Sequence, residues 1–546
     1  MNRRRFLEGT TALGVSAAFG YRTGALSVAS SDHPSSQPPE QSSFELSEIT
    51  ISALQRGMVE QRYTARSVVE LYLSRIDALD RAGPMLRAVI ELNPDALAIA
   101  ASLDAERKAG KVRGPLHGIP VLLKDVVDTA DRMRTTAGSL ALTQSFALRD
   151  AFIVERLRAA GAIILGKTNL SEWSNARSPH ATSGWSARGG LTKNAYVLDR
   201  TACGSSSGTG VAVAANLCAI GIGAETDGSI ACPASANSLV GIKPTLGLLS
   251  RSGLIPVTYS FDSAGPIART VTDAAILLGA LTGIDPRDEA TRGSPGHALI
   301  DYTKSLDKRA LAGARIGVLR RDRSEKSPVS GVFAESLRAM QSAGAILIED
   351  VDLPTFEELQ IPKAIVLLCE LKDSMRDYLG QRGSTERHKS LADLIRFNKE
   401  NADVELKWFG QEFFETAEGT SGRETRDYQP ALDRCLTLTR TTGFDRVLGE
   451  QRLDAIVSMA ANVPFTTDLL TGDHPIVRNS FLSAVAGYPR VTVPAGFVRG
   501  LPVGLSFMGG AWSEPRLIAL AYAFEQMVQA RRVPRFLPTA ALDNDS

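Results

Sequence analysis

The sequence predicts an α/β fold in which helices cover both faces of a sheet. Between about Leu86 and Thr282, short apolar runs alternate with alanine-rich segments. The runs at 120–123 and 162–165 have the length and composition of buried strands, whereas residues 211–219 have those of a helix. Strands that alternate with helices along a chain pack as a sheet between layers of helices, which is the basis of this prediction.

The rest of the chain fits around this region as one large domain over residues 45–535, followed by a tail at 536–546. Residues 301–460 are more charged and helical in pattern, and they predict an inserted helical region or cap. Strand-like sequence returns after residue 480, at 491–494 and 504–508, and a helix is predicted to follow over 513–530. Ahead of the sheet, Thr64 is the expected N-cap of an amphipathic helix that ends before Gly83 and Pro84.

The first 29 residues predict a twin-arginine-type signal peptide. Arg3 and Arg4 are followed by one spacer and then Phe-Leu, and a weakly apolar run and a Ser-Val-Ala cleavage sequence come next. The alternative is a chance basic start ahead of a disordered tail. A working leader implies a periplasmic or secreted protein, whereas a non-functional one implies a cytoplasmic protein. Residues 30–44 have the serine- and proline-rich composition of a linker.

The composition argues against several classes of binding partner. The 61 Lys and Arg residues almost cancel the 60 Asp and Glu residues, so nothing favours a nucleic acid. After the leader, the sequence has no apolar run long enough to span a membrane. The cysteines are few and lack CxxC spacing, so we expect small buried side chains rather than a zinc site or a disulfide framework. The cysteines are Cys203, Cys218, Cys232, Cys369 and Cys435.

Three motifs carry candidate chemistry. The sequence Cys-Gly-Ser-Ser-Ser-Gly-Thr-Gly at 203–210 places hydroxyls on a flexible loop before a helix. The polar turn at 223–233 delivers a single serine, Ser229, after Gly228, where successive backbone N–H groups can meet an oxyanion. In the sequence Gly-Ile-Pro-Val-Leu-Leu-Lys-Asp, Lys124 ends an apolar strand. The plain alternatives are a flexible linker, a turn with a structural serine and a surface lysine.

Other motifs in the same regions are weaker. Residues 204–208 match GxSxG, but no histidine stands in a recognisable setting to complete a triad. Residues 208–213 only half-match a dinucleotide fingerprint. Residues 161–168 satisfy the P-loop pattern letter by letter, yet the four intervening residues are apolar and predict a strand rather than a phosphate-binding loop.

The three motifs fit one chemistry. A lysine has an ordinary pKa near 10.4 and must be uncharged to act as a base at neutral pH. Burial against the apolar strand and contact with hydroxyls lower the pKa, and a shift of about three units corresponds to about 4 kcal/mol, which burial supplies. A bridging serine can then pass the proton from the nucleophile to Lys124 without a histidine.

These motifs resemble the amidase signature family, and similar segments extend from residue 118 to residue 505. The resemblance implies the amidase-signature fold, a mixed twisted sheet with helices on both faces. It also implies that Ser229 is the nucleophile, that Ser205 is the bridging serine with a cis peptide bond, and that Lys124 is the base. No cofactor and no metal are implied, and a monomer or homodimer is expected. The backbone N–H groups implied for the oxyanion hole are those of Thr226, Asp227, Gly228 and Ser229.

The sequence departs from the commonest family pattern behind the nucleophile. Glu225 replaces an aspartate, Asp227 replaces a glycine and Ala231 replaces an arginine, so the usual Asp–Arg pair is absent. The turn and several flanking segments resemble those of bacterial peptide amidases, which remove C-terminal amides. Residues 459–473 differ from that subgroup and imply a different substrate if they line the pocket.

The resemblance therefore implies a hydrolase that cleaves carboxamide bonds through an acyl-enzyme, on peptide C-terminal amides or related linear amides. Three alternatives stay open. The chain could be the glutamine-amidase subunit of a transamidating complex, which shares the motifs, although an export signal argues against it. It could be an esterase that uses the same residues. It could also keep the fold only for binding, although Lys124, Ser205 and Ser229 are all present.

Overall fold

The computed structural model describes residues 44–320, 328–349, 351–384, 386–474 and 479–540. The predicted leader, nearly all of the predicted linker and residues 541–546 of the tail lie outside the described residues. The described helices and strands all belong to one compact unit, Leu46–Ser546. Among the described helices, none is both long and apolar enough to cross a lipid bilayer.

One sheet of 11 strands organises this unit, in the order β1-β3-β2-β6-β8-β7-β12-β13-β11-β9-β10. The sheet is mixed, because β2 pairs in parallel with β3 and β6, whereas β8 runs antiparallel to β6 and β7. The strands are β1 (Val89–Leu92), β2 (Pro120–Lys124), β3 (Ile163–Thr168), β6 (Ile220–Glu225), β7 (Val240–Lys243), β8 (Ser263–Ala268), β9 (Arg315–Val318), β10 (Ile346–Ile348), β11 (Ala455–Met459), β12 (Arg490–Val498) and β13 (Leu501–Met508), with β4 (Trp185–Ser186) and β5 (Gly190–Leu191) as a separate pair.

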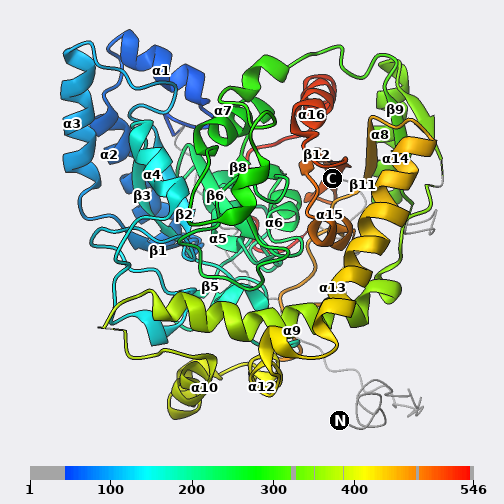
Figure 1. Ribbon diagram of the computed structural model, residues 1–546. Coiled ribbons are helices and arrows are strands. Elements are labelled where there is room, and N and C mark those ends of the chain that lie inside the picture. The colour runs from blue at the N-terminus through cyan, green and yellow to red at the C-terminus, as the bar shows by residue number, and fades with distance from the viewer. Residues whose placement is uncertain (1–43, 321–327, 350, 385, 475–478, 541–546) are drawn as a thin grey trace, which may run out of the picture. The chain divides into compact units, whose positions relative to one another are not determined.

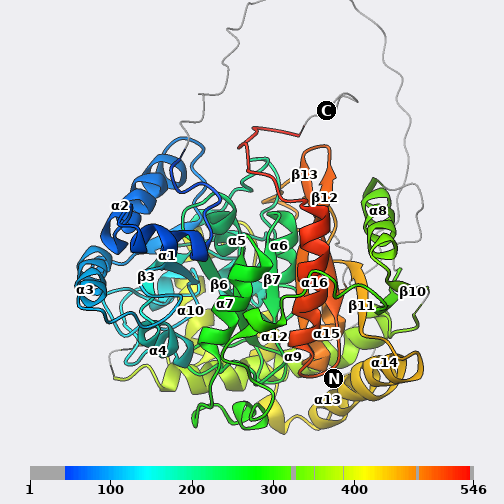
Figure 2. The same ribbon diagram turned by 90° about the horizontal axis from the view of Figure 1, so that it is seen from above.

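Helices cover both faces of the sheet, which confirms the predicted fold class. Figure 2 shows α5 and α6 on one side of β6 and β7, and α7 and α16 on the other. The helices are α1 (Ile51–Val59), α2 (Ala65–Ile76), α3 (Ala96–Lys108), α4 (Phe152–Ala159), α5 (Ser207–Ala214), α6 (Ala231–Ala236), α7 (Val271–Leu281), α8 (Pro328–Ser342), α9 (Phe356–Gly380), α10 (Leu391–Glu400), α11 (Ala402–Glu405), α12 (Glu412–Glu418), α13 (Tyr428–Leu436), α14 (Arg446–Glu450), α15 (Ser480–Ala486) and α16 (Glu514–Val528). Shorter 3-10 or π segments are η1 (Asp77–Arg81), η2 (Leu140–Leu142), η3 (Glu172–Asn175), η4 (Glu289–Gly293), η5 (Tyr302–Ser305), η6 (Gly422–Glu424) and η7 (Thr437–Asp445).

The core lies along the central strands. Every residue of β2, β3, β8 and β13 is buried, as expected for apolar runs between two helical layers. The P-loop-like segment is indeed a strand, β3, and Lys167 within it is buried. The Lys167 ammonium donates to the Val127 carbonyl at 2.6 Å and to the Thr135 hydroxyl at 2.8 Å, so internal acceptors already occupy it.

Local signals place the helix ends. Thr64 caps α2 as predicted, because its hydroxyl accepts the N–H of Ser67 at 3.0 Å. The helix predicted at 211–219 is α5, but it begins earlier, at Ser207, and ends at Ala214. Asn216 follows with a φ of 58°, a left-handed conformation that stops the helix.

The region 301–460 is mostly helical, yet it is more than a helical cap. Its strands β9, β10 and β11 join the main sheet and form one edge of it. These strands are only three to five residues long, which is too short for a clear period in the sequence. The long helix α9 packs against α12 and α13, and Figure 1 shows it running across the lower part of the molecule.

Candidate active site

Two parallel strands bring Lys124 and the polar turn to the same edge of the sheet. In β2 and β6, Val121 pairs with Ile220 and Leu123 with Ile222, so the carboxyl ends of both strands point the same way. Lys124 is the last residue of β2, and residues 223–225 of the predicted polar turn are the end of β6, with the rest of the turn directly after it. The side chain of Lys124 therefore reaches the segment that leads to Ser229.

Lys124 is buried and contacts the serine loop, residues 203–206 just before α5. Its Nζ donates to Ser205 Oγ at 2.7 Å and to the Ala224 carbonyl at 3.1 Å. Burial lowers the Lys124 pKa to about 7, although the negative charges of Asp262 and Glu225 oppose that shift. A neutral amine and a serine hydroxyl thus lie in hydrogen-bond contact near neutral pH, which is the arrangement needed for proton transfer between them.

Hydrogen bonds from the backbone and the side chain of Ser206 join the serine loop to the polar turn. The Gly204–Ser205 peptide bond is cis, as the family resemblance implies. The N–H of Ser206 donates to the Ser229 carbonyl at 3.2 Å, and the Ser206 hydroxyl donates to the Ala224 carbonyl at 3.1 Å. Ser205 is fully buried, whereas Ser229 keeps 7% of its surface exposed.

Glu225 binds the backbone behind Ser229, where the commonest family pattern has an Asp–Arg pair. Its Oε2 accepts the backbone N–H of Ile230 at 2.7 Å and that of Ala231 at 3.0 Å, at the start of α6. The carboxylate therefore binds the backbone directly behind Ser229 and needs no arginine at position 231. Because these two N–H groups are occupied, the groups that precede them in the turn are the candidates for an oxyanion hole.

The cysteine prediction is wrong for one pair. Cys203 and Cys232 form a disulfide with a Cα–Cα distance of 5.8 Å, although 29 positions separate them in the sequence. Cys218, Cys369 and Cys435 are free and buried, as expected. The spacing of the two cysteines in the sequence gave no signal for this pair. The fold alone brings them together, because the helices α5 and α6 that follow the serine loop and the polar turn are in contact.

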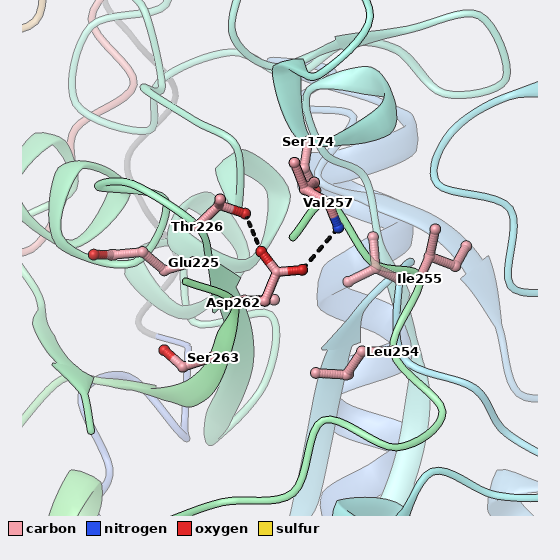
Figure 3. Close-up of a pocket in the computed structure, with 10 residues that line it drawn as sticks. Ser174, Glu225, Thr226, Leu254, Ile255, Val257, Asp262 and Ser263 are labelled. Atoms are coloured by element: carbon pink, nitrogen blue, oxygen red, sulfur yellow. Dashed lines mark hydrogen bonds between the residues drawn. The ribbon is translucent and has the colours of Figure 1, made fainter. Parts of the chain in front are cut away.

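A small pocket adjoins the turn, and its lining includes Asp262, a residue that the sequence did not single out. Val126, Leu254 and Ile255 form apolar parts of its wall, and Thr226 and Asp262 are among its polar residues. Figure 3 shows the Asp262 carboxylate between the Thr226 hydroxyl, which donates to it at 2.5 Å, and the backbone N–H of Val257, which donates at 2.7 Å. Burial raises the Asp262 pKa to about 6.

Two further observations concern residues 459–473 and possible metal ligands. Parts of residues 459–473 lie beside Thr182 and Ser183, since the Thr182 hydroxyl donates to the Asp468 carbonyl at 2.7 Å and the Ser183 N–H donates to Asp473 at 2.9 Å. Within the described ranges, no group of three or more His, Cys, Asp or Glu residues is arranged to hold a metal ion.

Comparison with known proteins identifies the family. The family model named Amidase matches residues 67–518, most of the chain. The chain belongs to the amidase family. It is accordingly a hydrolase of carbon–nitrogen bonds, and its fold is that of solved amidase structures.

Solved structures and relatives illustrate the range of this amidase family. The peptide amidase of Stenotrophomonas maltophilia is 47% identical, with a TM-score of 0.87 over 90% of this chain and 99% of that one. A peptide amidase structure with the same identity contains the competitive inhibitor chymostatin. A probable amidase of Arabidopsis thaliana is 42% identical over 91% of this chain and 93% of its own. A glutamyl-tRNA(Gln) amidotransferase subunit of Thermosynechococcus vestitus is 33% identical over 87% of this chain and 97% of its own.

Proposed function

We propose that this amidase cleaves carboxamide bonds through a serine–serine–lysine relay and an acyl-enzyme, on C-terminal peptide amides or related linear amides. The contact between Lys124 Nζ and Ser205 Oγ, made by a buried lysine with a pKa of about 7, carries the proposal. The likeness in sequence and fold to a peptide amidase supports the substrate class.

In the proposed reaction, neutral Lys124 takes a proton from Ser205 while Ser205 takes one from Ser229. The Ser229 oxygen attacks the carbonyl carbon, and the N–H groups of residues 226–229 stabilise the oxyanion. The relay returns a proton to the nitrogen as the carbon–nitrogen bond breaks, which releases ammonia or an amine. A water molecule then attacks the acyl-enzyme by the same relay and frees Ser229.

The direct test is the Ser229→Ala variant, assayed for ammonia release from amidated peptides and from aliphatic and aryl amides. We expect the rate to fall by about a thousandfold or more. Ser207→Ala is the matched control from the same serine-rich segment, and it should keep activity within a few-fold because Ser207 has no role in the relay. An active Ser229→Ala enzyme would refute the proposed nucleophile.

Further assays distinguish the proposed amidase from a binding protein, an esterase and a subunit of a transamidating complex. Labelling of Ser229 by a fluorophosphonate probe distinguishes an enzyme from a protein that only binds. Matched amide and ester substrates distinguish an amidase from an esterase. Glutamine hydrolysis together with co-purifying partner proteins would favour the transamidating role that the name of the Thermosynechococcus relative describes.

A further inference from the structure

An ion pair links helix α9 to the turn that carries Ser229. The Lys363 ammonium contacts Asp227 Oδ2, and the Ser480 hydroxyl, at the start of α15, donates to Asp227 Oδ1 at 2.7 Å. The side chains of Lys363 and Asp227 are only 13% and 19% exposed. The pair is therefore partly shielded from water, and removing one partner leaves the other charge poorly solvated.

The ion pair holds a residue whose own backbone N–H belongs to the proposed oxyanion hole. Asp227 lies between Thr226 and Gly228, among the residues whose N–H groups are proposed to bind the oxyanion. Gly228 has a φ of +83°, and a Cβ there would lie 2.7 Å from the Ser480 hydroxyl, so the turn is packed closely against α15. Such donors must lie about 2.7–3.1 Å from the oxyanion, and small displacements are costly.

Two neighbouring residues of the turn are thus held by different parts of the chain. The Thr226 hydroxyl donates to Asp262, which lines the pocket, and the Asp227 carboxylate contacts Lys363 and Ser480. Lys363 lies within the predicted cap region, far from the turn in the sequence. The ion pair therefore connects that region to the proposed catalytic turn.

We propose that Lys363 is a positioning residue that fixes the oxyanion-binding turn through Asp227. This inference rests on the proposed function, in which residues 226–229 stabilise the oxyanion. Lys363 acts on the transition state through the turn, without a contact to substrate of its own. Its loss should therefore lower kcat more than it raises KM.

The experiment is a double-variant cycle of Lys363→Met and Asp227→Asn. Lys363→Met removes the cation that holds the Asp227 carboxylate, and we expect kcat to fall about tenfold or more with KM within about threefold. In the Asp227→Asn background, Lys363→Met should lower kcat little further, because the carboxylate charge that Lys363 pairs with is already gone. Lys363→Arg should retain most of the activity, since it keeps a cation within reach of Asp227.

Two measurements exclude a merely structural effect. Lys372→Met is the matched control on the same helix, because Lys372 donates to the Glu418 and Thr420 carbonyls instead of the turn. It should leave kcat unchanged even if it lowers the melting temperature. A peptide trifluoromethyl ketone, which forms a tetrahedral oxyanion adduct with a serine, should bind Lys363→Met more weakly in proportion to the loss in kcat.

The results distinguish failure of the positioning role from failure of the proposed function. If Lys363→Met keeps wild-type kcat, if it matches Lys372→Met, or if the two substitutions of the cycle are simply additive, the inference is wrong. If Ser229→Ala remains active, the proposed function itself fails. An inactive Ser229→Ala together with a normal Lys363→Met removes only the positioning role.

Discussion

Cys203 and Cys232 are joined by a disulfide that brackets the two serines of the proposed relay, with Ser205 just after the first cysteine and Ser229 just before the second. The serine loop and the start of α6 are thereby connected covalently as well as through the hydrogen bond from Ser206 to Ser229. The geometry around Lys124 depends on both loops keeping this spacing.

Loss of the disulfide should destabilise the fold. Closing a loop of 29 residues constrains the unfolded chain, so we expect Cys203→Ser/Cys232→Ser to lower the free energy of unfolding by about 3–4 kcal/mol. Urea unfolding measures this change. A dithiol reductant should lower the melting temperature of the wild type and leave that of the double variant unchanged. A thiol assay on denatured, non-reduced protein should find the three free cysteines, and five reactive thiols would contradict the bond.

The activity should show an acidic limb set by Lys124. Its pKa is about 7, and only the unprotonated amine can accept the proton from Ser205. The value of kcat/KM should therefore rise about tenfold per pH unit below 7 and level off above it. Circular dichroism over the same range separates this limb from unfolding. A profile that stays flat down to pH 5 would argue against a lysine base.

Removal of the Asp262 charge should move that limb to lower pH. The negative charge of Asp262 favours protonated Lys124, so Asp262→Asn should lower the Lys124 pKa further. The measurement is kcat/KM against pH. Asp80→Asn is a matched control, because Asp80 is another buried carboxyl whose pKa is raised to about 6, and it binds the Ala88 and Val89 N–H groups away from the site. A shift towards higher pH, or an equal shift in the control, would contradict this relationship.

Glu225 should stabilise the start of α6 as a hydrogen-bond acceptor. Glu225→Ala leaves the N–H groups of Ile230 and Ala231 buried without their acceptor, at a cost of about 1–3 kcal/mol in unfolding free energy. Glu225→Gln keeps a carbonyl oxygen and should cost less. Chemical denaturation compares the two variants. Equal losses would show that the negative charge, rather than the acceptor, is what the turn requires.

The leader prediction concerns residues outside the described part of the chain. If residues 1–29 are a twin-arginine signal, Arg3→Lys/Arg4→Lys should block export of the folded protein. Cell fractionation and immunoblotting measure this loss. Arg5 is the spacer of the motif, so Arg5→Lys should leave export intact. Undiminished export of the double variant would remove the proposal of a periplasmic or secreted location.

The sequence determined a large part of this protein by itself. The alternation of strands and helices predicted the fold class, and the end of an apolar strand singled out Lys124, which is buried rather than the surface lysine that stayed open as the alternative. Thr64 marked a helix start, and the apolar residues at 161–168 correctly excluded a phosphate loop. These signals are local, since each depends on neighbouring residues whose spacing follows the period of a helix or strand.

The tertiary structure alone decided the contacts around the proposed relay. The pairing of Cys203 with Cys232, the place of Asp262 beside Thr226 and the reach of Lys363 to Asp227 join segments far apart in the sequence. The sequence also gave no indication that β9, β10 and β11 form one edge of the sheet. The physical reason is that burial and charge pairing depend on distance in space, which a single sequence records only between near neighbours.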